Sequence, residues 1–126
     1  MVKRINRKDW WHVPPEDPDA YKKRGKFLAS TYGEAEFWGR PLMEPLRVKV
    51  QSPLIGDEAT IEVELLGKRV ATEDIKVEAR FKLDARLKKA AVKQGYDCIV
   101  LMSPTGFREY KKSGKIPRSI ELNVFV

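Results

Sequence analysis

The chain has 126 residues, of which 42% are hydrophobic and 34% charged, and its formal net charge is +7. This length predicts one domain over residues 1–126, large enough to bury a core without a disulfide or metal. No apolar run reaches the roughly 20 residues that cross a bilayer, and none follows the basic N-terminus as in a secretory signal, so we expect a cytoplasmic protein without membrane contact. The single Cys98 and the single His12 exclude an internal disulfide and a His–Cys cluster. A site made of carboxylates alone stays open, but the chain has no loop signature for one such as D-x-D-x-D-G, so no metal is expected.

The first elements are predicted from prolines, caps and a short apolar run. Three prolines make residues 12–25 largely irregular, because proline lacks a backbone donor and disfavours helix before it. Residues 25–30 (GKFLAS) then predict a short strand. Thr31 and Glu34 have the spacing of a capping box, which predicts a helix that ends at Gly39.

The middle of the chain is harder to interpret. Alternating polarity over residues 45–54 (PLRVKVQSPL) predicts a half-buried strand. Residues 60–67 (TIEVELLG) fit a strand or a short helix, and residues 68–79 show no period. The clearest helix is predicted over residues 84–94, with Asp84 as its cap and a glycine directly after it.

Two strands are predicted near the end of the chain. Residues 96–102 (YDCIVLM) form an apolar run typical of a buried strand, in which Cys98 serves as a small apolar side chain. Residues 103–115 predict a loop and a short helix. Residues 119–126 (SIELNVFV) alternate between apolar and polar side chains. Because strands and helices are interspersed without regular alternation, we expect an α+β fold with a mainly antiparallel sheet.

Three segments, in this order, resemble the ADP-ribosyltransferase-like fold, which includes the NAD-using toxins and the poly(ADP-ribose) polymerases. WWHV (10–13) is similar to the aromatic-His-Gly motif of the first strand. GKFLASTYGEAEFWG (25–39) is similar to the family's strand and the helix after it. GYDCIVL (95–101) and SIELNVFV resemble the late helix–strand pair and the terminal strand that bears the family's Glu. The resemblance implies a single domain with a split, mainly antiparallel sheet and short helices.

The resemblance also implies a cofactor and site residues. It implies NAD, used for transfer of ADP-ribose to an acceptor such as a protein, or for hydrolysis. His12 matches the residue that contacts the adenosine ribose, and Glu121 matches the carboxylate that stabilises positive charge on the nicotinamide ribose as the glycosidic bond breaks. Trp38 and Phe27 fall where aromatics enclose nicotinamide, and Ser30 lies at the corner that would wall this pocket.

The chain departs from the family at several positions. Val13 stands where a Gly usually approaches the nicotinamide amide, Phe27 lacks a common hydroxyl, and Ala35 replaces a frequent Ser. These departures indicate a degenerate or inactive member. Ordinary roles fit the same residues: His12 as a packed side chain, Trp38 as core, and Glu121 as a solvated strand charge.

A different class, a non-catalytic module that binds RNA or single-stranded DNA, is the alternative. Basic residues cluster near both ends with aromatics between them, which suits phosphate contacts and base stacking. The same abundance of Lys and Glu also fits the surface of a thermophile protein. The candidate nucleic-acid contacts are Lys3, Arg4, Arg7, Lys8, Lys22, Lys23, Arg24, Lys111 and Lys112.

Overall fold

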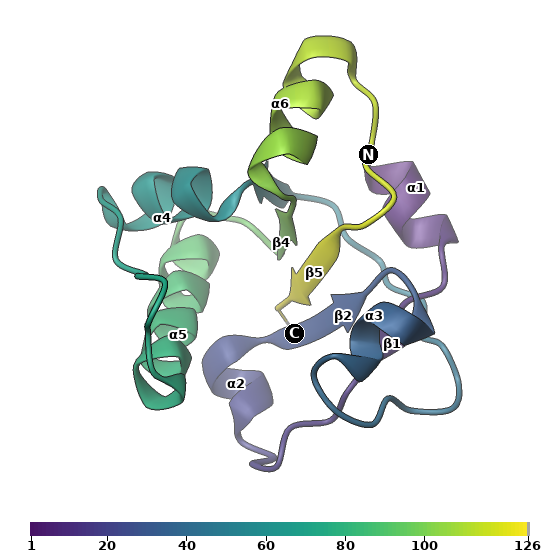
Figure 1. Ribbon diagram of the computed structural model, residues 1–126, viewed down its shortest axis with the longest axis horizontal. Helices are drawn as coiled ribbons and strands as arrows, with labels where there is room; N and C mark the ends of the chain where they lie inside the picture. The colour runs from purple at the N-terminus through teal and green to yellow at the C-terminus, as the bar shows by residue number, and fades with distance from the viewer. Residues whose placement is uncertain (126) are drawn as a thin grey trace.

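A single five-stranded sheet organises the part of the chain that the computed structural model describes, residues 1–125 (Figure 1). In spatial order the strands are β1, β2, β5, β4 and β3. Their bounds are Trp11–His12 for β1, Lys26–Ala29 for β2, Pro53–Gly56 for β3, Cys98–Leu101 for β4 and Glu121–Val124 for β5. The last strand in sequence is therefore central in the sheet. Val126, the end of the predicted strand 119–126, lies outside the described residues.

The five strands form one mixed sheet, so the expected split arrangement is wrong, and the expected antiparallel pairing holds for three of the four strand pairs. β3 and β4 run parallel, whereas the pairs β1–β2, β2–β5 and β4–β5 are antiparallel. Parallel neighbours need a long crossover connection, and two helices supply it between β3 and β4. The predicted α+β class with short helices is confirmed.

Helices cover both faces of the sheet. One face carries α1 and α6, because Ile5 and Phe107 share a buried cluster with Leu28, Val100 and Leu122. The other face carries α4 and α5, whose apolar side chains pack together on β3 and β4. Among residues 1–125 the helices are α1 (Val2–Arg7), α2 (Ala20–Arg24), α3 (Tyr32–Glu36), α4 (Glu58–Leu66), α5 (Val77–Lys93) and α6 (Pro104–Ser113). No helix within this range is long and apolar enough to span a membrane.

Two predicted elements are misplaced. Residues 45–54 do not form the predicted strand: Leu46 makes only an isolated bridge to Trp10, and β3 begins at Pro53. The helix predicted over residues 84–94 begins at Val77, so Asp84 lies inside α5 rather than at its cap. In the first turns of α5, apolar side chains are exposed and Asp84 is buried. The pattern of polar and apolar residues therefore does not indicate where this helix begins.

The predicted caps at two helix ends are confirmed, and the structure resolves one ambiguous segment as a helix. The Thr31 hydroxyl accepts a hydrogen bond from the Glu34 backbone N–H at 3.1 Å and so caps α3. The ambiguous residues 60–67 lie mostly in α4, which Asp57 caps. Gly95 follows α5 with a φ of 92°, a conformation that favours glycine. Two short helices were not predicted: α1 in the basic N-terminal segment and α2 within the proline-rich stretch.

Candidate functional site

Glu121 lies at the start of the central strand β5. Its backbone pairs with Ala29 of β2 on one side and Leu101 of β4 on the other. Because side chains alternate along a strand, Leu122 enters the core beneath α1 and α6, whereas Glu121 and Asn123 project toward α4 and α5. The polar residues of β5 therefore do not face solvent on an open sheet surface but a layer of helices.

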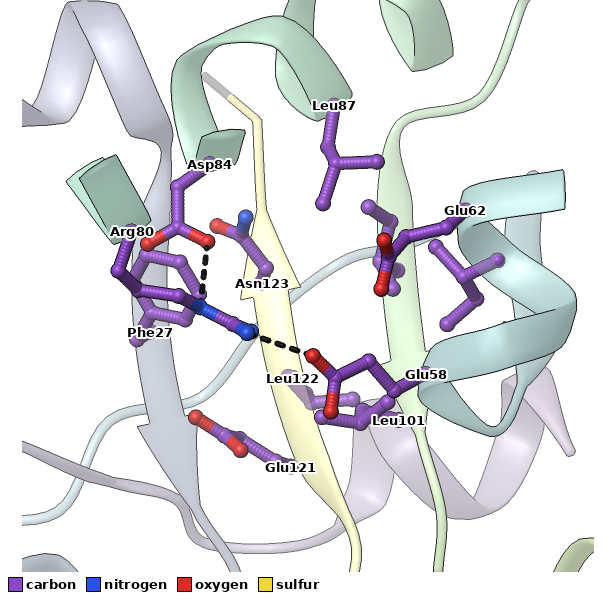
Figure 2. A pocket seen from close by; sticks show the side chains of 12 residues that line it. Phe27, Glu58, Glu62, Arg80, Asp84, Leu87, Leu101, Glu121, Leu122 and Asn123 are labelled. Carbon is purple, nitrogen blue, oxygen red and sulfur yellow. Dashed lines mark hydrogen bonds and ion pairs between the residues drawn. The ribbon is translucent and has the colours of Figure 1, made fainter. Parts of the chain in front are cut away.

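An ion-pair cluster lies over this face of β5 (Figure 2). Arg80 of α5 donates from Nη1 to Oε1 of Glu58 on α4 at 2.6 Å, and its Nε lies 3.4 Å from Oδ1 of Asp84. Glu121 lines the same small cavity of about 40 Å³, together with Asn123. The guanidinium of Arg80 thus joins the two helices directly above the carboxylate of the central strand.

The Glu121 carboxylate has no partner of its own. Within residues 1–125 no group donates a hydrogen bond to it, and no interaction joins it to the cluster in Figure 2. Burial raises its pKa from 4.5 to about 7; the charge of Arg80 opposes this rise, and the charges of Asp84 and Glu58 add to it. Glu121 is therefore a carboxyl group poised to change its protonation state near neutral pH.

Asp84 has a related but distinct environment. Burial raises its pKa from 3.8 to about 6, while the charges of Arg80 and Arg24 oppose the rise. Unlike Glu121, Asp84 is held by Arg80 and is 8% exposed. The two carboxyl groups thus differ in their position: Asp84 lies inside the ion-pair cluster, and Glu121 lies at its edge.

A larger groove of about 640 Å³ opens on the other side of Glu121. It lies where β2 and β4 end and β5 begins, so Ala29, Leu101 and Glu121 form its floor. Phe37 and Trp38, just after α3, line it with their rings edge to face at a centroid distance of 5.0 Å. The remaining lining includes the first residues of α4 and α6 and the side chains of Glu34, Arg69 and Ser119.

The two aromatic side chains of the groove are strongly exposed. Trp38 is 65% and Phe37 81% accessible to solvent, so Trp38 does not occupy the core position that was its alternative role. Large exposed apolar side chains in one place typically mark a binding surface. The groove thus combines an uncovered indole with an unpaired carboxylate.

The structure brings some of the predicted site residues together. Trp38 and Glu121 line the groove, and Phe27 lines the small cavity with Glu121. Ser30 is buried behind them, where its hydroxyl donates to the Ile120 carbonyl at 2.7 Å and accepts from the Ile120 N–H. This pair fixes the entry of the chain into β5 and so the position of Glu121.

His12 does not join this group. It is 3% exposed, with Nδ1 2.8 Å from the Phe27 carbonyl oxygen and Nε2 2.9 Å from the Tyr21 hydroxyl. Burial lowers its pKa, which the hydrogen bond to Phe27 opposes and the charge of Lys26 reinforces. His12 lines neither cavity. Its contacts instead tie β1 to β2 and to α2.

The predicted cationic contacts divide into two groups. Lys3, Arg4, Arg7 and Lys8 belong to α1 or follow it, and Lys111 and Lys112 belong to α6 on the same face of the sheet. Lys22, Lys23 and Arg24 belong to α2, which packs against α5. Two of them are engaged: Lys23 lies 3.8 Å from Asp17, and Arg24 lies over the ring of Phe81.

The cluster above Glu121 has only one local signal in the sequence. Arg80 and Asp84 are four residues apart, a spacing that brings their side chains together on one helix. The predicted helix starts at Asp84, so Arg80 falls outside it and the spacing of the two residues carries no prediction. The contribution of Glu58 had no local signal, because α4 and α5 meet only in the tertiary structure.

Comparison of the chain with protein-family models, with curated proteins and with solved structures finds no match. Among residues 1–125, no group of three or more His, Cys, Asp or Glu side chains is arranged to hold a metal ion.

Proposed function

We propose that this protein binds NAD in the groove beside Glu121 and acts on the bond between nicotinamide and ribose, as an ADP-ribosyltransferase-like protein. The observation that carries the proposal is the unpaired Glu121 carboxylate on the floor of a groove whose wall includes the exposed Trp38. A volume of about 640 Å³ lies within the range of small-molecule sites. The groove therefore offers space, a stacking surface and a charged group in one place.

The two residues have complementary roles in this proposal. Nicotinamide in NAD is a cationic aromatic ring, and an exposed indole favours such a ring through stacking and cation–π attraction. Cleavage sends the electron pair of the glycosidic bond to the nicotinamide nitrogen and leaves positive charge on the ribose. An ionised Glu121 stabilises that charge, and water or an acceptor then attacks the ribose carbon and releases a proton.

The proposal assigns other roles to the remaining candidates. Phe27 lies below the groove in the adjoining small cavity, so it supports Glu121 rather than contacting the ring. His12 and Ser30 are engaged in hydrogen bonds within the protein, and the proposal does not use them. The adenosine half of NAD would therefore be held without the histidine contact that the family resemblance implies.

Binding and turnover can be tested separately. Titration of NAD against the wild type should change tryptophan fluorescence, and Trp38→Phe should remove most of this change and weaken binding. Released nicotinamide, measured by chromatography, reports cleavage. Glu121→Gln should retain binding and lower release roughly a hundredfold or more, the size typical of a missing transition-state contact. Glu36→Gln on the exposed surface of α3 is the matched control and should behave as wild type.

Each outcome has a definite meaning. If the wild type does not bind NAD at all, the proposed function is wrong. If Glu121→Gln releases nicotinamide as fast as the wild type, the role of Glu121 is wrong. Because the carboxylate must be ionised, release should also rise with pH through about 7, and a rate that falls over this range would contradict the mechanism.

A further inference from the structure

We propose that the face formed by α1, α6 and the segment after α6 binds the phosphodiester backbone of a nucleic acid. We call the cations of residues 1–9 and 104–118 the terminal basic surface. Its members are Lys3, Arg4, Arg7, Lys8, Arg108, Lys111, Lys112, Lys115 and Arg118. None of these nine cations lines the groove beside Glu121, and the proposal does not rest on NAD binding.

The net positive charge of the molecule comes from the residues of this surface. Residues 1–9 and 104–118 contain nine of the 25 Lys and Arg side chains but only two of the 18 acidic ones. The rest of the chain holds sixteen of each sign, so it contributes no net charge. The formal net charge of +7 therefore comes entirely from these two segments. A uniformly charged surface, as expected for thermal adaptation alone, would not be divided in this way.

The fold brings the two segments to the same side of the sheet. Ile5 of α1 and Phe107 of α6 belong to one buried cluster. Met1 and Ile116 also pack against that cluster, and Figure 1 shows the chain after α6 passing close to the N-terminus. Cations about a hundred residues apart in sequence thus flank a single core. Only the tertiary structure creates this surface.

The cations are available for a ligand. Eight of the nine residues are exposed; Lys8 is half-buried, and its Nζ donates to the Ser30 carbonyl oxygen at 2.8 Å. Within residues 1–125 none of the nine forms an ion pair, whereas Lys23, Arg47, Arg69 and Arg80 elsewhere all do. Lys111 lies 4.6 Å from the centroid of the Phe107 ring, which supports its stem while the charge remains at the surface. Unpaired like charges that repel one another favour a polyanionic partner.

The chemistry of the surface favours a nucleic acid over an anionic membrane. Helices that bind a bilayer surface insert an apolar face below their cations. Here the apolar residues of both helices, Ile5 and Phe107, are buried in the core. The large exposed hydrophobic side chains of residues 1–125 all lie outside the two basic segments. A surface of cations without an insertion face suits phosphodiesters, whose sequence-independent binding is essentially electrostatic.

The test uses full-length protein and a fluorescently labelled single-stranded oligoribonucleotide, followed by anisotropy over a range of salt concentrations. For a single strand, log K should fall with log salt at a slope of about −0.7 for each phosphate neutralised. The variant K112Q/K115Q/R118Q should reduce affinity roughly ten- to hundredfold at low salt and flatten the slope by about 2. The variant K3Q/R4Q/R7Q should do the same, because both helices form one surface.

The matched control removes the same charge from another face. K82Q/K89Q/K93Q changes three exposed lysines of α5 and should retain most of the affinity. Equal losses in the control and in the α1 and α6 variants would mean that only net charge matters, which would overturn the proposal. Absence of binding at low salt would also overturn it. A competition experiment adds phosphatidylserine vesicles at a phosphate concentration equal to that of the oligonucleotide. If the protein binds the vesicles in preference to the oligonucleotide, the surface is a membrane-binding one instead.

Discussion

Glu121 shows how one side chain can acquire unusual chemistry from its neighbours. On the sequence it is an ordinary charge in an alternating strand. In the fold it lies under two helices, beside two other carboxylates and a single guanidinium that already bonds both of them. Burial without a hydrogen-bond donor penalises the ionised form, and this raises the pKa of Glu121 to about 7.

We predict that this shift makes stability depend on pH. A pKa that is higher in the folded state means that the folded chain binds an extra proton between pH 4.5 and about 7. The stabilisation from this group is complete below its unfolded pKa and is lost as pH rises through the folded value. Glu121→Gln removes the ionisation, so at pH 8 it should be more stable than wild type by up to about 3 kcal/mol.

Urea unfolding at a series of pH values measures this difference. Wild type minus Glu121→Gln isolates the contribution of Glu121, because Asp84, whose raised pKa acts in the same direction, is present in both proteins. A difference that stays constant from pH 4 to pH 8 would contradict the raised pKa.

At the scale of elements, the junction between α2 and β2 depends on one glycine. Gly25 ends α2 with a φ of 87°, a conformation that L side chains rarely adopt. A Cβ at this position would lie 2.2 Å from Oδ1 of Asn123, which leaves no room for it. Asn123 in turn donates from Nδ2 to the Arg24 carbonyl at 2.9 Å. The glycine therefore lets β5 hold the end of α2 directly.

We predict that Gly25→Ala lowers the free energy of unfolding by at least about 2 kcal/mol, from backbone strain and steric overlap together. Gly33→Ala is the matched control: Gly33 lies in α3 with nothing near its Cβ position, so alanine should be neutral or stabilise by up to about 1 kcal/mol. Chemical denaturation of both variants gives the comparison. Equal stability of Gly25→Ala and wild type would show that the junction can rearrange freely.

At the scale of the whole molecule, the sheet couples two cores. β4 contributes Cys98 and Val100 to the cluster beneath α1 and α6, and Ile99 to the cluster beneath α4 and α5. Neither cluster can lose its packing without exposing the strand that they share. The two cores should therefore unfold together, although they lie on opposite faces.

Two spectroscopic probes can test this cooperativity. Trp10, Trp11 and Trp38 all lie in the first third of the chain, whereas far-ultraviolet circular dichroism is weighted toward α5, the longest helix of the described residues. We predict one transition with the same midpoint by both probes in urea. Separate midpoints would mean that the α4–α5 layer and the remainder of the molecule are independent units.

The elements that depend on local chemistry could be predicted from the sequence. The capping residue Thr31, the glycine after α5 and the apolar run of β4 are specified by neighbours within a few residues, and the structure confirms them. The alternation of residues 119–126 likewise predicts β5, whose apolar Leu122 lies in the core.

What covers the polar side of that strand could not be predicted, because it depends on how distant segments pack. The alternation of side chains assigns residues to the two faces of a strand, but it does not predict whether the polar face is exposed to solvent or covered by helices. Here α4 and α5 cover Glu121 and Asn123. The same limit applies to Glu58 and Arg80, and to the two basic segments that share one face. Contacts between distant segments depend on how the crossover and the helices pack, and no local pattern records that geometry. For this reason the strand was predictable from the sequence, whereas the groove, the cluster and the terminal basic surface were not.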